Sequence, residues 1–260
     1  MKNRVKRGGR WLSLCLVILA SATVLCAADI GTNDGRLQSL GREKLNKAKV
    51  GDKVDIQVEN GAAILSGSVD SIGQKERASK EVAKIQGILS VANNLNIVAG
   101  TTDDQIAALA AHGVRLYPFY TIFDNIELSV NNGRLKITGQ VTQPWRKADI
   151  GRIVSVVPGV REVENDLEVL PLSPFDNQLR MRIAMAIYRD PLLSSYAIRA
   201  DPTIHIIVNN GNVTLTGVVL NDVDKAAAGR DARFAATYFQ LDNQLRVENT
   251  AAKASPKPKP

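Results

Sequence analysis

Cysteine and histidine are scarce in this chain. Its 260 residues include two cysteines and two histidines. Both cysteines, Cys15 and Cys26, lie close to the N-terminus. A zinc site needs three or four ligands, usually Cys or His, and a disulfide needs paired cysteines. We therefore expect no metal site and no disulfide after residue 28, so packing must stabilise the fold.

Motifs for catalysis are also lacking. No G-x-S-x-G turn and no phosphate-binding glycine loop occurs. His205 stands between Ile204 and Ile206 in an alternating segment, so we expect an ordinary surface or half-buried histidine on the opposite face of a strand. We predict that the protein is not an enzyme and has no catalytic residue, no cofactor and no small-molecule substrate.

The first 28 residues have the layout of a secretory signal peptide. An apolar run, Trp11 to Leu25, follows a basic start and precedes the small residues Ala27 and Ala28. The run is about 15 residues, whereas a membrane span needs roughly 20. We expect cleavage near Ala28 and an exported product; the alternatives are an uncleaved anchor, cleavage at residues 20–22, and lipidation of Cys26, which Leu25 disfavours.

The net charge of +7 belongs to the two ends of the chain. Five basic residues and no acidic residue lie in the signal segment, and the end of the chain adds three lysines. The body between them is close to neutral, so the charge does not indicate nucleic-acid binding. We expect residues 250–260, rich in Lys and Pro, to be a disordered tail. The basic residues are Lys2, Arg4, Lys6, Arg7 and Arg10, then Lys253, Lys257 and Lys259.

An Asn-Gly pair occurs three times, and the residues after it repeat with fixed spacing. In each copy a second glycine follows the first after 6 residues, and an asparagine follows that first glycine after 32 residues. Chance does not keep such a register three times, so one fold unit is repeated. The copies are Asn60-Gly61, Gly67 and Asn93; Asn132-Gly133, Gly139 and Asn165; and Asn210-Gly211, Gly217 and Asn243.

Each unit is predicted to fold as α-β-β-α-β. Apolar residues alternate on both sides of each Asn-Gly pair, which is typical of two strands joined by a two-residue hairpin turn. A helical pattern follows, then a third strand, and a further helix precedes each unit. We expect an α+β fold with two helices covering one face of a mixed three-stranded sheet. The expected domains are residues 34–100, 101–172 and 173–249, and the third strands are residues 91–97, 163–169 and 241–247.

The recurring glycines and asparagines have backbone explanations. Gly61, Gly133 and Gly211 are expected at turn positions with positive φ. Glycine inside the second strand indicates a bulge or a close approach by a helix. For the recurring asparagines, a ligand contact and a structural role remain open, and a side chain that satisfies backbone groups is the favoured interpretation.

These residues resemble the BON domain family (bacterial OsmY and nodulation). The match is clearest from Ile204 to Val219, with Asp190-Pro191-Leu192 before it and Asn243-Gln244-Leu245 after it. The second unit is similar from Ile126 to Val169, and the first is looser. The resemblance implies a periplasmic or outer-membrane-associated protein, linked to envelope and osmotic stress and to phospholipid interaction. It implies no catalytic residues.

Aromatic residues gather in the second unit. Four lie between residues 117 and 123, and the only tryptophan after residue 28 follows the hairpin. Tyr and Trp suit a boundary between apolar and wet surroundings, so an exposed contact patch and core packing are both open. A basic stretch that includes Arg42, Lys44 and Lys47 could meet anionic head groups or be a solvated helix face. The aromatic residues are Tyr117, Phe119, Tyr120, Phe123 and Trp145.

The sequence thus predicts an exported, non-enzymatic envelope protein. Its expected partner is an anionic phospholipid or a membrane-associated envelope protein, and not nucleic acid. The alternative is an assembly module that stacks on itself or on a secretion or outer-membrane complex. An exposed aromatic patch favours the lipid interpretation, and aromatics buried between units favour assembly.

Overall fold

The computed structural model describes residues 19–98, 100–198 and 203–248, and side chains from residue 33 onward. The predicted signal peptide lies outside these residues up to position 18, and its last ten residues begin helix α1 (Leu19–Lys47). The predicted tail lies outside them as well. No helix in the described ranges is long and apolar enough to cross a membrane.

The chain forms two compact units, Met1–Val69 with Gln74–Asn96, and Asp70–Gly73 with Ile97–Pro260. The first holds most of the first sequence repeat, and the second holds the second and third repeats. In the first repeat, α1 leads to strands β1 (Val54–Glu59) and β2 (Ala62–Val69), helix α2 (Ile72–Ala83), and strands β3 (Ser90–Asn93) and β4 (Asn96–Ile97).

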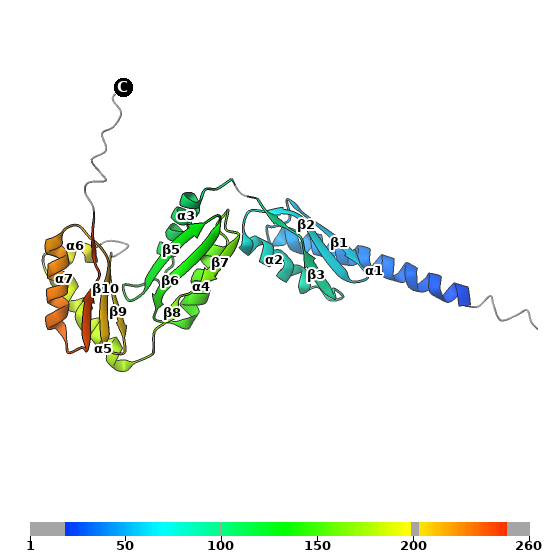
Figure 1. Cartoon of the computed structure of the whole chain (residues 1–260). Helices are drawn as coiled ribbons and strands as arrows, with labels where there is room; N and C mark the ends of the chain where they lie inside the picture. Colours follow the sequence, from blue (N-terminus) through cyan, green and yellow to red (C-terminus); the bar gives the residue numbers. More distant parts are fainter. Residues whose placement is uncertain (1–18, 99, 199–202, 249–260) are drawn as a thin grey trace, which may run out of the picture. The chain divides into compact units, whose positions relative to one another are not determined.

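The second and third repeats have the same order of elements (Figure 1). The second repeat comprises α3 (Asp103–Arg115), β5 (Asn125–Asn131), β6 (Arg134–Val141), α4 (Pro144–Ser155), β7 (Glu162–Asn165) and β8 (Glu168–Val169). The third comprises α5 (Pro174–Arg189), α6 (Ser194–Ala197), β9 (Ile204–Asn209), β10 (Asn212–Val219), α7 (Asp222–Ala235), β11 (Gln240–Asn243) and β12 (Arg246–Val247). The predicted α-β-β-α-β order is confirmed, with the short helix α6 as an addition.

Each sheet is mixed, as predicted. The two hairpin strands pair antiparallel, for example Ile56 with Leu65, and the last strand pairs parallel to the second. That last strand differs from the prediction because it is divided into two short strands in every repeat. The break lies just after the recurring asparagine, where the Asn94, Asp166 and Gln244 amides donate to the second strand. Both parts pair with the same central strand, so the sheet keeps three strand positions.

Two helices cover one face of each sheet and enclose the core (Figure 1). In the second repeat, Ile106 and Val114 of α3 meet Ile150 and Val154 of α4 over Ile137 of the central strand, and all five side chains are buried. The helical and alternating patterns of the sequence account for these positions because each places its apolar residues on one face.

The hairpin turns have the backbone that the Asn-Gly pairs predict. Asn132 has φ 51° and Gly133 has φ 76°, and the other two turns agree within a few degrees. The glycine in the second strand is also left-handed, but the predicted approach of a helix is wrong. A Cβ on Gly139 would lie 2.1 Å from the carbonyl oxygen of Asn125, at the start of the neighbouring strand β5. The glycine is required because the paired strand itself comes that close.

Candidate functional site

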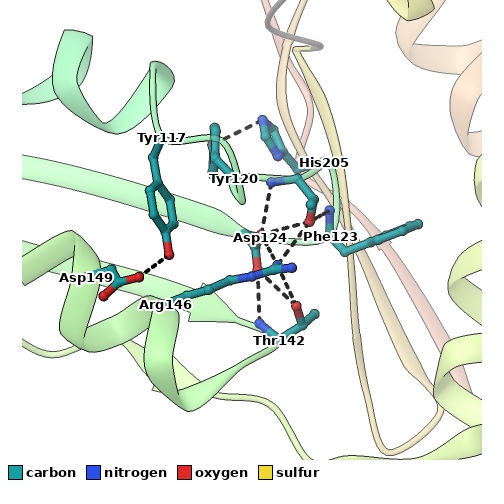
Figure 2. A network of polar contacts seen from close by, with 9 residues as sticks. Tyr117, Tyr120, Phe123, Asp124, Thr142, Arg146, Asp149 and His205 are labelled. Atoms are coloured by element: carbon teal, nitrogen blue, oxygen red, sulfur yellow. Dashed lines mark hydrogen bonds and ion pairs between the residues drawn. The ribbon is translucent and has the colours of Figure 1, made fainter.

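The aromatic residues of the second repeat lie around the loop between α3 and β5, here called the aromatic loop (residues 116–124). Its last residue, Asp124, is fully buried. The Asp124 carboxylate accepts hydrogen bonds from the Thr121 and Thr142 amides and hydroxyls and from Arg146, at 2.5 to 3.2 Å (Figure 2). A buried charge with so many donors fixes the loop against strand β6 and helix α4.

Tyr117 is a core residue. Its ring packs with the buried side chains of the second repeat, and its hydroxyl donates to Asp149 Oδ2 at 2.6 Å (Figure 2). Burial, with a smaller effect of the bond to Asp149, raises the pKa of Tyr117 to about 12. The same bond, with Arg152, lowers the pKa of Asp149.

Phe119 and Trp145 form an exposed pair. The side chains are 54% and 43% exposed, and their rings meet edge to face with centroids 5.1 Å apart. Phe119 also meets the edge of Tyr117 at 5.7 Å. The guanidinium of Arg146 lies 5.3 Å from the centre of the Trp145 ring, within cation–π range. The pair therefore presents two aromatic rings at the surface of the second repeat, with the largely buried Arg146 beneath Trp145 and paired to Asp124.

Tyr120 and Phe123 face the third repeat. The Tyr120 ring lies 5.5 Å from that of His205, with its hydroxyl 3.5 Å from Nε2 (Figure 2). Phe123 and Ile122 pack against the core of the third repeat. The Ile122 carbonyl accepts a hydrogen bond from the Ile206 amide of β9 at 2.8 Å. His205 is buried, which corrects the expected surface or half-buried position, because Tyr120 of the second repeat packs against its ring.

The predicted aromatic cluster is thus divided among three environments. Tyr117 belongs to the core, Phe119 and Trp145 to the surface, and Tyr120 and Phe123 to the contact with the third repeat. The two interpretations of the sequence, core and exposed patch, each hold for part of the cluster. Its assignment as a contact site stays a prediction for the exposed pair.

The predicted basic residues lie on the exposed face of α1. Arg42, Lys44 and Lys47 are all exposed, and Lys47 pairs with Glu43 at 2.5 Å. An exposed pair of this kind contributes little to stability. This helix face is in the first compact unit and the aromatic pair in the second.

The recurring asparagines are structural, as favoured from the sequence. Asn165 Nδ2 donates to the Lys147 carbonyl at 2.8 Å, and its Oδ1 accepts from the Leu167 amide. Asn93 and Asn243 make the same two bonds in their repeats. Each asparagine joins the second helix to the break in the last strand.

A recurring aspartate was not recognised in the sequence. Asp34, Asp103 and Asp176 each accept from both amides of an Asn-Gly turn, at 2.7 to 3.1 Å. The number of residues from aspartate to glycine is 27, 30 and 35, so no fixed spacing reveals it. Asp103 and Asp176 stand in the first turn of their helices, a signal that could have found these two, whereas Asp34 lies well inside α1.

A second exposed aromatic surface, on the third repeat, was also missed. Phe175 and Phe239 lie beside the turn glycine Gly211, where an added Cβ would come within 3.5 Å of both rings. Phe239 is 82% exposed, and Phe234, at the end of α7, is equally exposed. Three of the five phenylalanines therefore stand in the third repeat with their side chains largely in solvent.

The fold defines a tandem array of small α-β-β-α-β domains whose second and third members expose aromatic side chains. The family model for the BON domain matches residues 33–99, 120–171 and 176–249, and the chain belongs to the BON domain family. The three matches confirm three tandem copies. No curated protein matches the chain.

Two solved structures of CdsD, a structural protein of the type III secretion system of Chlamydia trachomatis, are similar to this chain. The first, its C-terminal domain, has a TM-score of 0.23 and 15% identity, covering 81% of this chain and 96% of that one. The second has a TM-score of 0.23 and 13% identity, covering 85% and 98%.

Proposed function

We propose that this protein binds the surface of an envelope membrane, with anionic phospholipid as its ligand, and catalyses no reaction. The observation that carries the proposal is the exposed Phe119–Trp145 pair with Arg146 beside it. Aromatic rings bury apolar area at about 25 cal/mol per Å², and the indole N–H of Trp145 suits the head-group region. The predicted signal peptide and membership of the BON family support an envelope location, periplasmic or at the outer membrane.

The exposed phenylalanines of the third repeat offer a second surface of the same kind. Phe175 and Phe239 flank the hairpin turn, and Arg233 adjoins Phe234 at the end of α7. Arg42 and Lys44 of the first repeat would add attraction to an anionic surface, by about 1 kcal/mol for each basic residue close to it.

Vesicle flotation with tryptophan fluorescence tests the proposal. In the exported form, expected to begin near Asp29, Trp145 is the only tryptophan. Vesicles of phosphatidylglycerol should float the protein and shift Trp145 emission to the blue, and phosphatidylcholine vesicles should do so less. Phe119→Ser should weaken flotation, whereas Leu109→Ser, at another exposed apolar position of this repeat, should not.

Two further measurements separate the contributions of the basic residues and of the two aromatic surfaces to vesicle binding. Added salt should weaken the part due to Arg42, Lys44 and Lys47 and leave the aromatic part. Phe239→Ser should weaken flotation without changing the Trp145 shift, because the two residues lie in different repeats. If anionic vesicles neither float the protein nor change its emission, membrane binding is refuted.

An assembly module is the second candidate. The specific observation in its favour is the packing of Ile122 and Phe123 against the core of the third repeat, since it shows aromatic-loop residues joining two domains. The same kind of contact between copies of the chain would build a stack or dock it on an envelope complex. Sedimentation equilibrium distinguishes this candidate, because assembly requires a mass above that of one chain without lipid.

A further inference from the structure

The free edge of the third sheet is covered at three points. Strand β9 lies at that edge, and three of its outward backbone groups bond to groups from outside the sheet. The Ile204 carbonyl accepts from the Tyr188 hydroxyl at 2.6 Å, and the Val208 carbonyl accepts from Arg180 Nη2 at 2.6 Å. Between them, the Ile206 amide donates to the Ile122 carbonyl of the aromatic loop. Native proteins cover such edges because uncovered strands recruit further strands.

The equivalent edge of the second sheet is built differently. Leu128 of β5 pairs with Ile137 at the register where Ile206 of β9 pairs with Leu215. By this equivalence, the backbone groups of β5 that point away from β6 belong to Ile126, Leu128 and Val130. The side chains above this edge come from the first helix of the repeat, α3 in place of α5.

Helices α5 and α3 can be aligned on the aspartate that binds the hairpin turn, Asp176 and Asp103 respectively. Four residues after this aspartate, α5 has Arg180 and α3 has Ala107. The twelfth residue is Tyr188 in α5 and Arg115 in α3. The long side chain that covers the third edge at Val208 is therefore replaced by a methyl group over the second edge. The space that Arg180 fills in one repeat is left open in the other.

A groove of about 700 Å³ runs along this part of the second repeat. One side is apolar, formed by Ala107, Ala111, Ile126 and Leu128, and the other comes from β9, β10 and β12 of the third repeat. Thr216, on that second side, is nine-tenths buried, and its hydroxyl oxygen has no partner among the described residues. Ligand-binding clefts in proteins commonly have volumes of about 300–1,000 Å³.

The charges around the groove favour an acidic occupant. Arg115 and Arg246 line it at two places, from the second and the third repeat, and Glu127 is the one acidic residue among its described lining residues. An extended segment would turn alternate side chains toward α3, with its alanines and Arg115, and toward the third repeat, with Arg246.

We propose that this groove binds an extended acidic peptide segment of a partner protein, which adds a strand to the edge of β5. The aromatic loop provides the precedent within the chain, because its Ile122 carbonyl already bonds the equivalent edge amide of β9. Main-chain hydrogen bonds supply affinity in this mode, and side-chain pockets supply specificity. The site is separate from the exposed Phe119–Trp145 pair.

Fluorescence anisotropy of the exported protein tests this site. The probe is a short labelled peptide of alternating valine and glutamate, compared with a valine–lysine peptide and with a valine–glutamate peptide N-methylated along one edge. The acidic peptide should bind saturably and more tightly than the basic one. N-methylation should weaken binding by about tenfold or more, because it removes main-chain donors.

A matched pair of variants locates the site. Ala107→Arg introduces the residue that covers the third edge and should weaken peptide binding by about tenfold or more. Ala108→Arg makes the same change at the next, exposed position of α3 and should leave binding unchanged. Both variants should keep vesicle binding, so failure of this proposal is distinguishable from failure of the membrane proposal.

Amide exchange reports on the edge without any variant. In the free protein the Leu128 amide should exchange faster than the Ile206 amide, and the valine–glutamate peptide should slow it. The proposal is overturned if Leu128 is as protected as Ile206 before the peptide is added. It is also overturned if the valine–glutamate peptide does not bind saturably. The same holds if the N-methylated peptide binds as tightly as the unmodified one, or if Ala107→Arg binds the peptide as tightly as Ala108→Arg.

Discussion

The guanidinium Nη1 of Arg146 lies 2.5 Å from Oδ2 of Asp124, and the aspartate is fully buried. Arg146 also donates to the Thr142 hydroxyl, and its guanidinium lies near the Trp145 ring. One side chain therefore connects the buried network of the aromatic loop with the exposed aromatic pair. Loss of this ion pair should affect both the stability of the second repeat and the position of Trp145.

We predict that Arg146→Met lowers the free energy of unfolding by about 3–5 kcal/mol, because it leaves a buried carboxylate without its cation. Arg152→Met removes the cationic partner of Asp149 at an exposed site and should cost less than about 1 kcal/mol. Urea denaturation followed by circular dichroism measures both. Equal costs for the two substitutions would contradict the assigned role of Arg146.

The two neighbouring asparagines of the first repeat form a second matched pair. Asn93 bonds the Lys75 carbonyl, the Ser79 hydroxyl and the Leu95 amide, whereas Asn94 is exposed. Asn93→Ala should lower stability by about 1–3 kcal/mol, because it leaves partly buried groups without partners. Asn94→Ala should change it by less than about 0.5 kcal/mol. Thermal denaturation measures the difference, and similar melting temperatures would remove the structural role of Asn93.

The strand glycines should tolerate no side chain. Gly139 has φ 115°, and an added Cβ would lie 2.1 Å from the Asn125 carbonyl oxygen. Gly139→Ala should cost at least about 2–3 kcal/mol, because strained backbone and displaced strand add together. Gly100→Ala is the control, since a Cβ there meets nothing within 4 Å. A Gly139→Ala protein as stable as the control would show that β5 can move away.

Tyr117 should make the second repeat sensitive to alkali. Its pKa rises from 10.0 to about 12 on folding, so the folded protein holds the phenolic proton more tightly than the unfolded chain. The resulting stability is complete below pH 10 and is lost as the pH rises from 10 toward about 12.

Tyr117→Phe should remove this part of the alkaline loss. Burial also raises the pKa of Tyr188, which contributes in the same direction, so the measured quantity is the difference between wild type and variant. Urea denaturation provides it at several pH values, from about one unit below the ordinary tyrosine pKa to about two units above it. Parallel stability profiles for the two proteins would refute the prediction.

Much of the fold could be predicted because its signals are local and repeat. Asn-Gly turns, alternating strands and helical faces each act within a few residues, and three copies made the register certain. The break in the last strand was missed because it depends on where Asn165 reaches the Lys147 carbonyl, 18 residues away. Only the folded chain brings those two groups together.

The candidate site was less predictable than the fold. Sequence proximity grouped Tyr117, Phe119, Tyr120 and Phe123, but the loop points neighbouring residues in different directions. The directions of these side chains are set by Asp124, which holds the loop in place through bonds to Thr142 and Arg146, 18 and 22 positions away. The exposed phenylalanines of the third repeat were missed for a similar reason, because their grouping around Gly211 joins α5, a turn and the residue before β11.

The bond from Asp34, Asp103 or Asp176 to its turn is kept although the connection between the two changes in length. The segment between the first helix and the first strand is therefore a natural insertion point. The third repeat already accommodates α6 there. A fluorescent or affinity tag placed between α1 and β1 of the first repeat should leave the helix anchored to its hairpin, whereas in the second repeat the same segment is the aromatic loop and is held by the Asp124 network.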